Sequence, residues 1–428
     1  MRSARRRSCF TPFCIEIDIG AITKSYAQQV LEKQFLYDVA SMFSKRTDWE
    51  LALNRFTEVH QEVIAAGREV LDLTVSNPAR AGFAYDDEAI LKALAQPEAM
   101  DYDPQPKGLR SAREAVAAYY RDQHQGFDLE SLVLTTSTSE GYSYVFRLLC
   151  NPGDEILVPK PSYPLFEFLA DLQDVKLVPY PLLYDHGWQI DFPSVYKAVN
   201  HRTRAVVVVH PNNPTGSYVS AVERAPLNVF CREHNLALIV DEVFLDYALD
   251  GTQRPTFALN QDVLTFTLSG LSKISGLPQM KLAWLATSGP EDEVKAAMAR
   301  LEVISDTYLS MNAPIQLATP VLLDQRKSIQ PLLLDRLRTN LQQLDGQLAK
   351  QKTCQRLEVE GGWYVVLRVP VTQSDEDLAI ALLREKFVLV HPGHFYDFPS
   401  DGYLVLSLIT PPEQFRAGMD RVFELLNG

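Results

Sequence analysis

Lys273 is the residue whose type and setting most directly suggest chemistry. It lies in LSKISGLPQMKLAW, between a predicted strand and a loop that contains glycine. Ligands of open α/β sheets bind where the strands end, and burial in such a crevice favours the neutral, nucleophilic amine. Lys273 can therefore form a Schiff base with an aldehyde cofactor, although a solvated loop lysine gives the same short string.

Two polar residues follow other predicted strands. Asp241 ends the strand that begins with the apolar run LALIV, and Asn213 lies in HPNNPTG directly after AVVVV. A carboxylate at the first position can keep the pyridine nitrogen of a cofactor protonated, and an amide at the second can donate to a phenolate oxygen. A cap by Asp241 and an ordinary turn around Asn213 are the alternatives.

A third group of residues has the composition of an anion site. The string TTSTSEGYSYVF places Ser137, Thr138 and Ser139 between a predicted strand and a helical run. Unpaired N–H groups at a helix start, with hydroxyls beside them, suit a phosphate, and a simple N-cap is the alternative. Tyr163, in PKPSYPLF after another strand, offers a ring that can stack on a planar cofactor or simply pack.

The elements that must position these residues alternate between short apolar runs and amphipathic stretches. This pattern favours an α/β architecture with a largely parallel sheet. The run AVVVV shows no polar alternation, so we expect it near the centre of a sheet that is covered on both faces. Seven strands are predicted, over residues 132–135, 155–158, 175–178, 205–210, 236–241, 263–267 and 281–287.

Beyond the last of these strands the pattern changes. A long helical region is predicted over about 290–350, with breaks near 312–314 and near Pro331, because proline interrupts a helix interior. The tail is predicted as strand 363–368, helix 375–385, strands 388–391 and 404–408, and helix 412–426. These elements make a small α+β unit.

Composition restricts the classes of function. The 428 residues carry 41 basic and 54 acidic side chains, and the net charge of −13 disfavours nucleic acid as a partner. No uncharged apolar run approaches the roughly 18 residues of a membrane span, so no membrane partner is expected. Five widely spaced cysteines, without zinc-site spacing, predict a reducing cytoplasm and no metal site.

The strings TSTSE, NPGDEILVPKPSYP, HPNNPTG, DEVF and LSKISG occur in this order. With them the chain resembles a class I/II aminotransferase of the fold-type I pyridoxal phosphate-dependent family, from about Leu71 to the C-terminus. The resemblance implies an α/β fold with two parts. One is a large domain with a mostly parallel seven-stranded sheet covered by helices, and the other is a small α+β domain from the C-terminal part and the N-terminal segment.

Four segments are expected on this basis. Residues 1–41 are a leader, disordered or not translated, since MFSKRTDW at Met42 looks like a natural start. Residues 42–100 are an N-terminal segment that joins the small domain. Residues 101–300 form the large cofactor-binding domain, and residues 301–428 form the long helical connection and the small C-terminal domain.

The resemblance also implies a role for each site residue. Lys273 corresponds to the Schiff-base lysine that also moves the proton, Asp241 to the partner of the pyridinium, and Asn213 to the donor for the ring oxygen. Tyr163 corresponds to the stacking aromatic, and Asn77 and Arg80 to the substrate side. The residues implied for the cofactor's phosphate are Ser137, Thr138, Ser139, Ser272, Lys281 and a Tyr102 that reaches the neighbouring subunit's site, so that a homodimer shares its active sites.

Four positions depart from the family's pattern. Phe244 replaces a tyrosine that donates to the cofactor's ring oxygen, and Gly270 replaces a phosphate-binding serine, which leaves Ser272 or Ser269 as a substitute. Lys281 replaces an arginine, which keeps the charge but loses the bidentate fork. Val405 replaces the arginine that clamps the substrate's α-carboxylate, so the substrate is left open.

The expected function is transfer of an amino group between an amino acid and a 2-oxo acid, through a Lys273 Schiff base of pyridoxal 5'-phosphate. The partners are then a small-molecule amino donor and a keto acceptor. A β-lyase or another α-carbon reaction on the same fold is the alternative. A regulatory protein that binds the cofactor without turnover is a more distant one, because no helix-turn-helix pattern precedes the domain.

Overall fold

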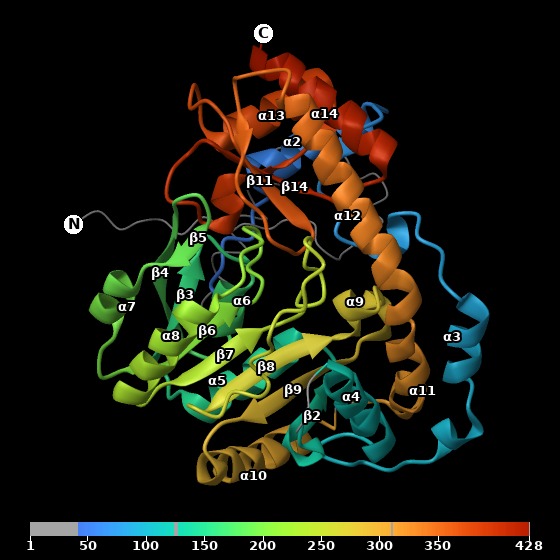
Figure 1. The fold of residues 1–428 in the computed structure, drawn as a ribbon, viewed down its shortest axis with the longest axis vertical. Helices are drawn as coiled ribbons and strands as arrows, with labels where there is room; N and C mark the ends of the chain where they lie inside the picture. The colour runs from blue at the N-terminus through green and yellow to red at the C-terminus, as the bar shows by residue number, and fades with distance from the viewer. Residues whose placement is uncertain (1–41, 124–126, 310, 428) are drawn as a thin grey trace.

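The computed structural model describes residues 42–123, 127–309 and 311–427, so the leader predicted over 1–41 lies outside the described residues. Its central feature is an eight-stranded sheet of order β2-β9-β8-β7-β6-β3-β4-β5, with helices on both sides (Figure 1). The strands are β2 Leu132–Thr135, β3 Glu155–Lys160, β4 Lys176–Tyr184, β5 Trp188–Ile190, β6 Thr203–Val209, β7 Ala237–Asp241, β8 Thr265–Gly270 and β9 Ala283–Ser288.

The seven predicted strands are confirmed, and the sheet is mixed. Strands β8, β7, β6, β3 and β4 pair in parallel, whereas β9 runs antiparallel to both β2 and β8. The short edge strand β5, which pairs antiparallel with β4, is an eighth strand that the sequence did not predict. Its three residues are too few to show a periodic pattern.

The helices that cover the sheet and build the rest of the fold are long where the sequence is amphipathic. They are α2 Arg55–Ala65, α3 Asp87–Leu94, α4 Arg110–Gln123, α5 Thr138–Leu149, α6 Phe166–Asp171, α7 Phe192–Ala198, α8 Ala221–Glu233, α9 Leu271–Ile274, α10 Glu291–Tyr308, α11 Ala313–Asp324, α12 Arg326–Leu348, α13 Asp375–Lys386 and α14 Pro412–Asn427. Short 3-10 turns are η1 Lys45–Thr47, η2 Pro78–Arg80, η3 Pro97–Met100, η4 Leu129–Ser131, η5 Pro278–Met280 and η6 Gly393–Tyr396.

Strand β6 shows why the apolar run AVVVV is continuous. Ala205, Val207 and Val209 belong to a buried cluster with residues of α5, α6 and α10. The alternate residues Val206 and Val208 belong to a second cluster with α7 and α8. Because successive side chains of a strand point to opposite faces, a strand covered by helices on both faces is apolar throughout.

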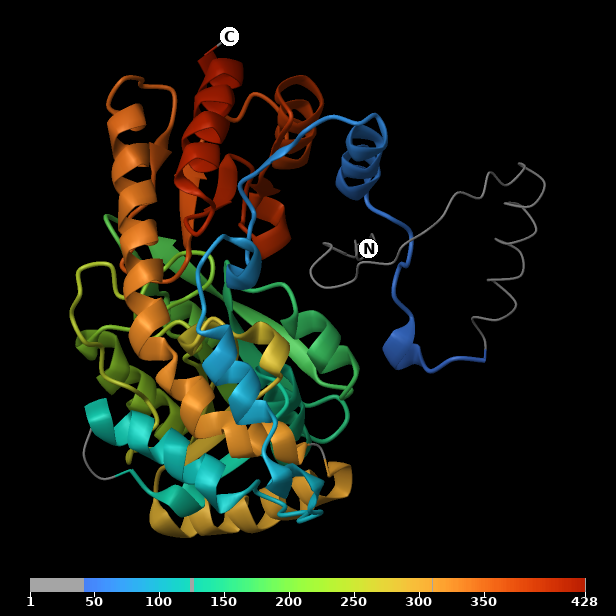
Figure 2. The ribbon, with the colours of Figure 1, turned by 90° about the vertical axis from the view of Figure 1, so that its right-hand side faces the viewer.

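The small domain contains the four-stranded sheet β10-β11-β14-β13, at the top of Figure 1. The N-terminal segment joins it, since α2 lies against α13 (Figure 2). The rings of Phe56 and Phe395 meet edge to face at 5.6 Å. Its strands, with the parallel pair β1-β12 beside them, are β1 Leu71–Asp72, β10 Gln355–Arg356, β11 Tyr364–Arg368, β12 Val388–Leu389, β13 His391–Pro392 and β14 Tyr403–Ser407.

Two predictions about the chain's organisation need correction. The 42–100 segment contributes to both cores, because Phe56 packs with the small domain whereas Ile90 and Ala93 of α3 pack with α4 and α11. The helix break predicted near Pro331 is wrong, since Pro331 lies within α12 and the break between α11 and α12 falls at Gln325. A proline in the second turn removes one hydrogen bond, and the buried face of α12, with Leu333 and Leu337, outweighs that loss.

Within the described ranges, no helix is long and apolar enough to cross a membrane. The same residues contain no group of three or more His, Cys, Asp or Glu side chains that could hold a metal ion.

Candidate active site

The sheet register brings the predicted site residues to one edge. Val209, at the end of β6, pairs with Asp241 at the end of β7, and Asp241 pairs with Leu268 of β8. Asn213 follows four residues after Val209, and Lys273 follows five residues after Leu268. The carboxyl ends of these three parallel strands therefore place an amide, a carboxylate and an amine at the same edge, where open α/β sheets bind ligands.

Asp241 is a buried carboxylate with fixed orientation. It is 9% exposed, accepts a hydrogen bond from the Tyr142 hydroxyl at 3.2 Å, and accepts another from the Val243 N–H at 3.1 Å. Burial raises the pKa of Asp241 to about 6, although these two hydrogen bonds and the positive charge of Lys273 act in the opposite direction. Near neutral pH the carboxylate is thus ionised and aimed by groups from two elements.

Tyr142 is a functional neighbour that sequence reasoning missed. It lies on α5 one turn after Thr138, inside the string TTSTSEGYSYVF, and it is 2% exposed. Spacing of four residues puts it on the same helix face as Thr138, but helical spacing could not identify Asp241 as its acceptor.

Glu242, the next residue, points to the opposite face of the sheet and is 1% exposed. Its carboxylate accepts hydrogen bonds from the Phe257 N–H and the Thr256 hydroxyl. Burial raises the pKa of Glu242 to about 7, against the lowering effect of these bonds and of Arg224. The group positions the loop at 256–257 behind the β7 strand end, and it lies outside the site itself.

The raised pKa of Glu242 predicts a pH-dependent stability term. The folded chain holds this proton more tightly than the unfolded chain, so the stability contributed by Glu242 falls as pH rises from about 4.5 to about 7. Glu242→Gln cannot ionise and should gain stability over the parent by roughly 3 kcal/mol across that window. Denaturant unfolding of both cofactor-free chains at about pH 5 and about pH 8 measures the difference. A difference that is constant with pH would contradict the assignment.

Lys273 lies in α9, and its amine has an aromatic environment. The Nζ atom is 4.6 Å from the ring centroid of Trp363 and 5.3 Å from that of Phe244. The Tyr247 hydroxyl donates to the Lys273 carbonyl at 2.6 Å, which fixes the backbone that carries the amine. Trp363 was not singled out in the sequence, because it lies 90 residues after Lys273 and only the docking of the small domain brings it there.

Two glycines lie where neighbouring elements pack closely, near the predicted anion-binding residues. A side chain on Gly141 of α5 would meet the Leu268 Cδ2 atom at 2.4 Å, and one on Gly270 would meet the Ala283 Cβ and Cα atoms at 2.8 and 2.9 Å. Close approach of β9 to β8 thus requires glycine at 270, whereas a side chain at 141 would displace the end of the Leu268 side chain. The structure gives a physical reason for the missing serine at 270.

The predicted anion-binding residues lie near Gly141 and Gly270. Ser137 is the N-cap of α5, and its hydroxyl accepts from the Glu140 N–H at 3.2 Å, so Thr138 and Ser139 occupy the first turn. Ala283 of β9 pairs with both Thr135 and Gly270, which brings the exposed Lys281, two residues earlier, to the same edge. Ser272, half-buried in α9, completes the group. By contrast, the buried Ser269 hydroxyl donates to the Glu242 carbonyl at 3.4 Å.

Tyr163 and the predicted substrate-side residue Asn77 lie in loop segments outside the sheet. Tyr163 follows β3, is 38% exposed, and lies close enough to Tyr142 and Tyr364 to add to the raised pKa that burial gives both hydroxyls. Asn77 caps η2 by accepting from the Ala79 N–H at 3.1 Å. The adjoining segment touches the lysine loop, since the Tyr85 hydroxyl donates to the Gly276 carbonyl at 2.8 Å.

Two predicted site residues, and the position where the family has a carboxylate-binding arginine, lie apart from the Lys273 amine. Arg80 is exposed at the end of η2, and Tyr102 is 79% exposed in the segment before α4. Val405 is fully buried in β14, where it pairs with Val366 and His391. Its side chain belongs to the core of the small domain.

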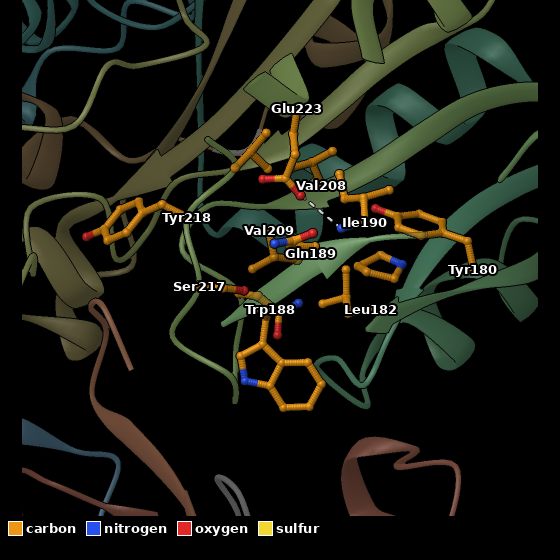
Figure 3. Close-up of a pocket in the computed structure, with 13 residues that line it drawn as sticks. Tyr180, Leu182, Trp188, Gln189, Ile190, Val208, Val209, Ser217, Tyr218 and Glu223 are labelled. Atoms are coloured by element: carbon orange, nitrogen blue, oxygen red, sulfur yellow. Dashed lines mark hydrogen bonds between the residues drawn. The ribbon is translucent and has the colours of Figure 1, made fainter. Parts of the chain in front are cut away.

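A small cavity lies on the other side of the 210–219 turn, between β5 and the end of β6 (Figure 3). Its volume of about 20 Å³ is suited to a water molecule rather than a cofactor. Asn212, next to Asn213, lines it together with Trp188 and Ser217. The two neighbouring asparagines therefore have different surroundings.

Comparison with known proteins agrees with this geometry. The family described as aminotransferase class I and II matches residues 68–421. The chain belongs to this family. It is 30% identical over 374 residues to a glutamate-pyruvate aminotransferase, AlaA, of Haemophilus influenzae, a match that covers 82% of this chain and 90% of that protein. It is 29% identical over 385 residues to an alanine aminotransferase of Mycobacterium bovis, covering 86% and 89%.

Solved aminotransferases share the fold. An alanine aminotransferase from Pyrococcus furiosus superposes with a TM-score of 0.82 at 23% identity, covering 90% of this chain and 99% of that one. An aminotransferase from Escherichia coli gives 0.80 at 25% identity, covering 90% and 98%. The protein is therefore an aminotransferase, with the pyridoxal phosphate dependence of its family.

The residues of the site fit this cofactor. The amide of Asn213 has a buried Oδ1 atom without a hydrogen-bond partner among the described residues, and its Nδ2 group is the donor that a ring oxygen would require. An ionised carboxylate, a lysine amine and the start of α5 lie beside it at one strand edge. These are the donor and acceptor types that a pyridinium, an aldehyde and a phosphate require.

Proposed function

We propose that this aminotransferase moves an amino group between alanine or glutamate and a 2-oxo acid such as pyruvate. The observation that carries the proposal is the match, over 82% and 86% of the chain, to relatives named glutamate-pyruvate and alanine aminotransferase. When bound, pyridoxal phosphate supplies an aldehyde that condenses with amines and a ring that takes up electrons.

Each catalytic group then has a defined task. Lys273 would be the covalent anchor, and its Nζ, when not joined to the cofactor, would carry the proton from the substrate's α-carbon. Asp241, oriented by Tyr142 and Val243, holds a proton on the ring nitrogen, because an ionised carboxylate beside that nitrogen favours its charged form. Asn213 donates to the ring oxygen, and the ring of Tyr163 covers the cofactor's face.

The phosphate is held by the start of α5 and by a lysine. Ser137, Thr138 and Ser139 offer hydroxyl and N–H donors, and Lys281 supplies a positive charge from the neighbouring strand end. Ser272 takes the place of the hydroxyl that Gly270 cannot supply. A lysine donates to the phosphate as a point charge, where an arginine would bind in two-pronged fashion.

We also propose a cytoplasmic homodimer with shared sites. Cys150, Cys231 and Cys354 are free thiols, which suits a reducing compartment. Tyr102 and Met100 are 79% and 89% exposed on the single chain, as residues that a partner subunit covers would be.

Mixing two inactive variants tests the shared site. Tyr102→Ala and Lys273→Ala chains should each lose most activity, whereas refolding them together should restore up to about a quarter of the parent activity, since one site in each mixed dimer regains both residues. Each variant refolded alone is the control. No recovery in mixtures that are shown to contain mixed dimers would refute sharing through Tyr102.

Val405 occupies the position at which the family has an arginine for the substrate's α-carboxylate. We propose that Arg80 supplies the positive charge instead. It lies at the end of η2, and the neighbouring Tyr85 reaches the lysine loop at Gly276. A charge-assisted pair contributes about 1.5–3 kcal/mol, so Arg80→Ala should lower kcat/KM for the amino donor roughly ten- to a hundredfold, mainly through KM. Cofactor retention should stay at the parent level.

Arg232→Ala is the matched control for Arg80→Ala, because Arg232 is a surface arginine on α8 that pairs with Asp262. An unchanged KM for Arg80→Ala, equal to that of the control, would remove Arg80 from the site. It would also favour a substrate without a conventional α-carboxylate.

A screen of amino donors tests the proposed substrates. The holoenzyme is incubated with pyruvate and single amino acids, and alanine formation is followed. Glutamate should be among the best donors, and alanine should be active in the reverse direction. Turnover with other donors and none with glutamate or alanine would overturn the substrate proposal while leaving amino-group transfer intact.

A further inference from the structure

The amine of Lys273 lies against aromatic rings from both domains. Phe244 and Tyr247 belong to the loop after β7, and Trp363 immediately precedes β11 of the small domain. The ring of Trp363 contacts the rings of Phe244 and Tyr247, with centroid separations of 5.2 Å in both cases and interplanar angles of 65° and 75°. The ring environment of the amine is therefore a packed arrangement and does not depend on a single mobile side chain.

Trp363 contributes a buried ring to the packing, and its indole N–H makes no hydrogen bond within the described residues. The side chain is 0% exposed, and its indole Nε1 atom is buried without an acceptor among the described residues. Its carbonyl accepts from the Leu408 N–H at 2.8 Å, which ties the residue to the end of β14. A large ring whose N–H is left unpaired indicates that the position is occupied for packing and for the ring face.

The geometry favours an ammonium at this position. The Nζ atom is 4.6 Å from the Trp363 centroid and 5.3 Å from the Phe244 centroid, both within the 6 Å or so at which a cation is attracted to an aromatic ring. Tryptophan gives the strongest attraction of the aromatic side chains, and the attraction grows when the pair is removed from water. Phe244 adds a second ring but no hydroxyl.

We propose that the face of Trp363 is the docking position of the Lys273 ammonium whenever the lysine is not joined to the cofactor. The inference rests on the proposed role of Lys273 as covalent anchor. Trp363 is then a positioning residue of the amino-transfer reaction, which stabilises the released lysine and keeps it beside the reacting carbon.

If Trp363 docks the free ammonium, loss of its ring should change covalent retention of the cofactor in the direction opposite to that expected for a purely structural residue. When Nζ joins the aldehyde carbon, two of the three ammonium protons leave with the aldehyde oxygen as water, and the third stays on nitrogen. The free ammonium is consumed, so a group that stabilises it opposes formation of the covalent bond. Removing the ring should strengthen covalent retention of the cofactor, whereas damage to the site would weaken it.

The test is an equilibrium measurement that does not use turnover. Cofactor-free parent, Trp363→Phe and Trp363→Leu proteins are titrated with pyridoxal phosphate and reduced with borohydride. The fraction of the Lys273 peptide that carries the cofactor is then determined by mass spectrometry. We expect the covalent equilibrium constant to rise roughly five- to thirtyfold in Trp363→Leu, with Trp363→Phe between it and the parent because phenylalanine keeps a weaker ring face.

Trp188→Leu is the matched control, since Trp188 also has a buried indole nitrogen without a partner but contacts Tyr184 and Phe398 rather than the lysine. It should match the parent. Weaker or unchanged covalent retention in Trp363→Leu would overturn the proposal. If that variant does not fold, Trp363→Phe decides by itself: a rise of at least about twofold supports docking, and no rise overturns it. Labelling of a lysine other than Lys273 would instead show that the anchor is misassigned.

Discussion

Lys273→Ala should abolish covalent retention of pyridoxal phosphate and lower kcat/KM by at least on the order of 10³-fold, because in the proposed mechanism one side chain supplies both the anchor and the proton carrier. The amine lies at the strand edge with Asp241, and methyl replacement leaves neither nucleophile nor base. Borohydride reduction followed by peptide mapping measures the first loss, and steady-state kinetics with excess cofactor measure the second.

Lys295→Ala is the control for this substitution, since Lys295 is a surface lysine on α10 that pairs with Glu291 one turn away. It should behave as the parent in both assays. A Lys273→Ala protein that still formed a reducible bond and turned over at the parent rate would remove the lysine from its assigned role, and the assignments of its neighbours would lose their basis.

Asp241→Ala should be the second most damaging change. The variant should fold, bind the cofactor weakly and lose catalysis by on the order of 10²- to 10⁴-fold, because in the proposed mechanism the Asp241 carboxylate keeps the ring nitrogen protonated. Burial raises the pKa of Asp241 to about 6 in the cofactor-free chain, so the affinity of that chain for the cofactor should fall as pH drops through about 6. Cofactor titration at several pH values and steady-state kinetics measure these effects.

Two variants separate the charge of Asp241 from its packing. Asp241→Asn keeps the size and the bond from the Val243 N–H but loses the charge, so it should be nearly as inactive as the alanine variant. Asp324→Ala, at an exposed carboxylate that pairs with Lys327, should match the parent. Near-normal turnover of Asp241→Asn would refute the electrostatic role.

The parts of the fold that could be predicted are those fixed by local sequence. Val206 and Val207 of β6 face different helices, so the run is apolar at every position and reads directly as a central strand. Asp241 was found because it ends such a run and the end of a strand is where ligands bind. The helix break predicted near Pro331 was wrong because packing of the buried face of α12 outweighs the local effect of the proline.

The parts of the site that could not be predicted depend on contacts between distant segments. Tyr142 reaches Asp241 across 99 residues, and Trp363 reaches Lys273 only because the small domain folds back on the sheet. The absent serine at Gly270 was visible in the sequence, yet its cause, the approach of Ala283, required the strand register. Single-sequence patterns carry periodicity and caps but not such pairings.

The most direct test of the central claim, amino-group transfer through Lys273, is a half-reaction without an acceptor. The holoenzyme is mixed with excess glutamate or alanine, and the bound cofactor and released products are quantified. The account predicts one 2-oxo acid per active site, conversion of the bound aldehyde to its amine form, and no free ammonia. A cofactor that stays in the aldehyde form without release of a 2-oxo acid would contradict it, as would repeated release of ammonia when a β-substituted amino acid replaces glutamate or alanine.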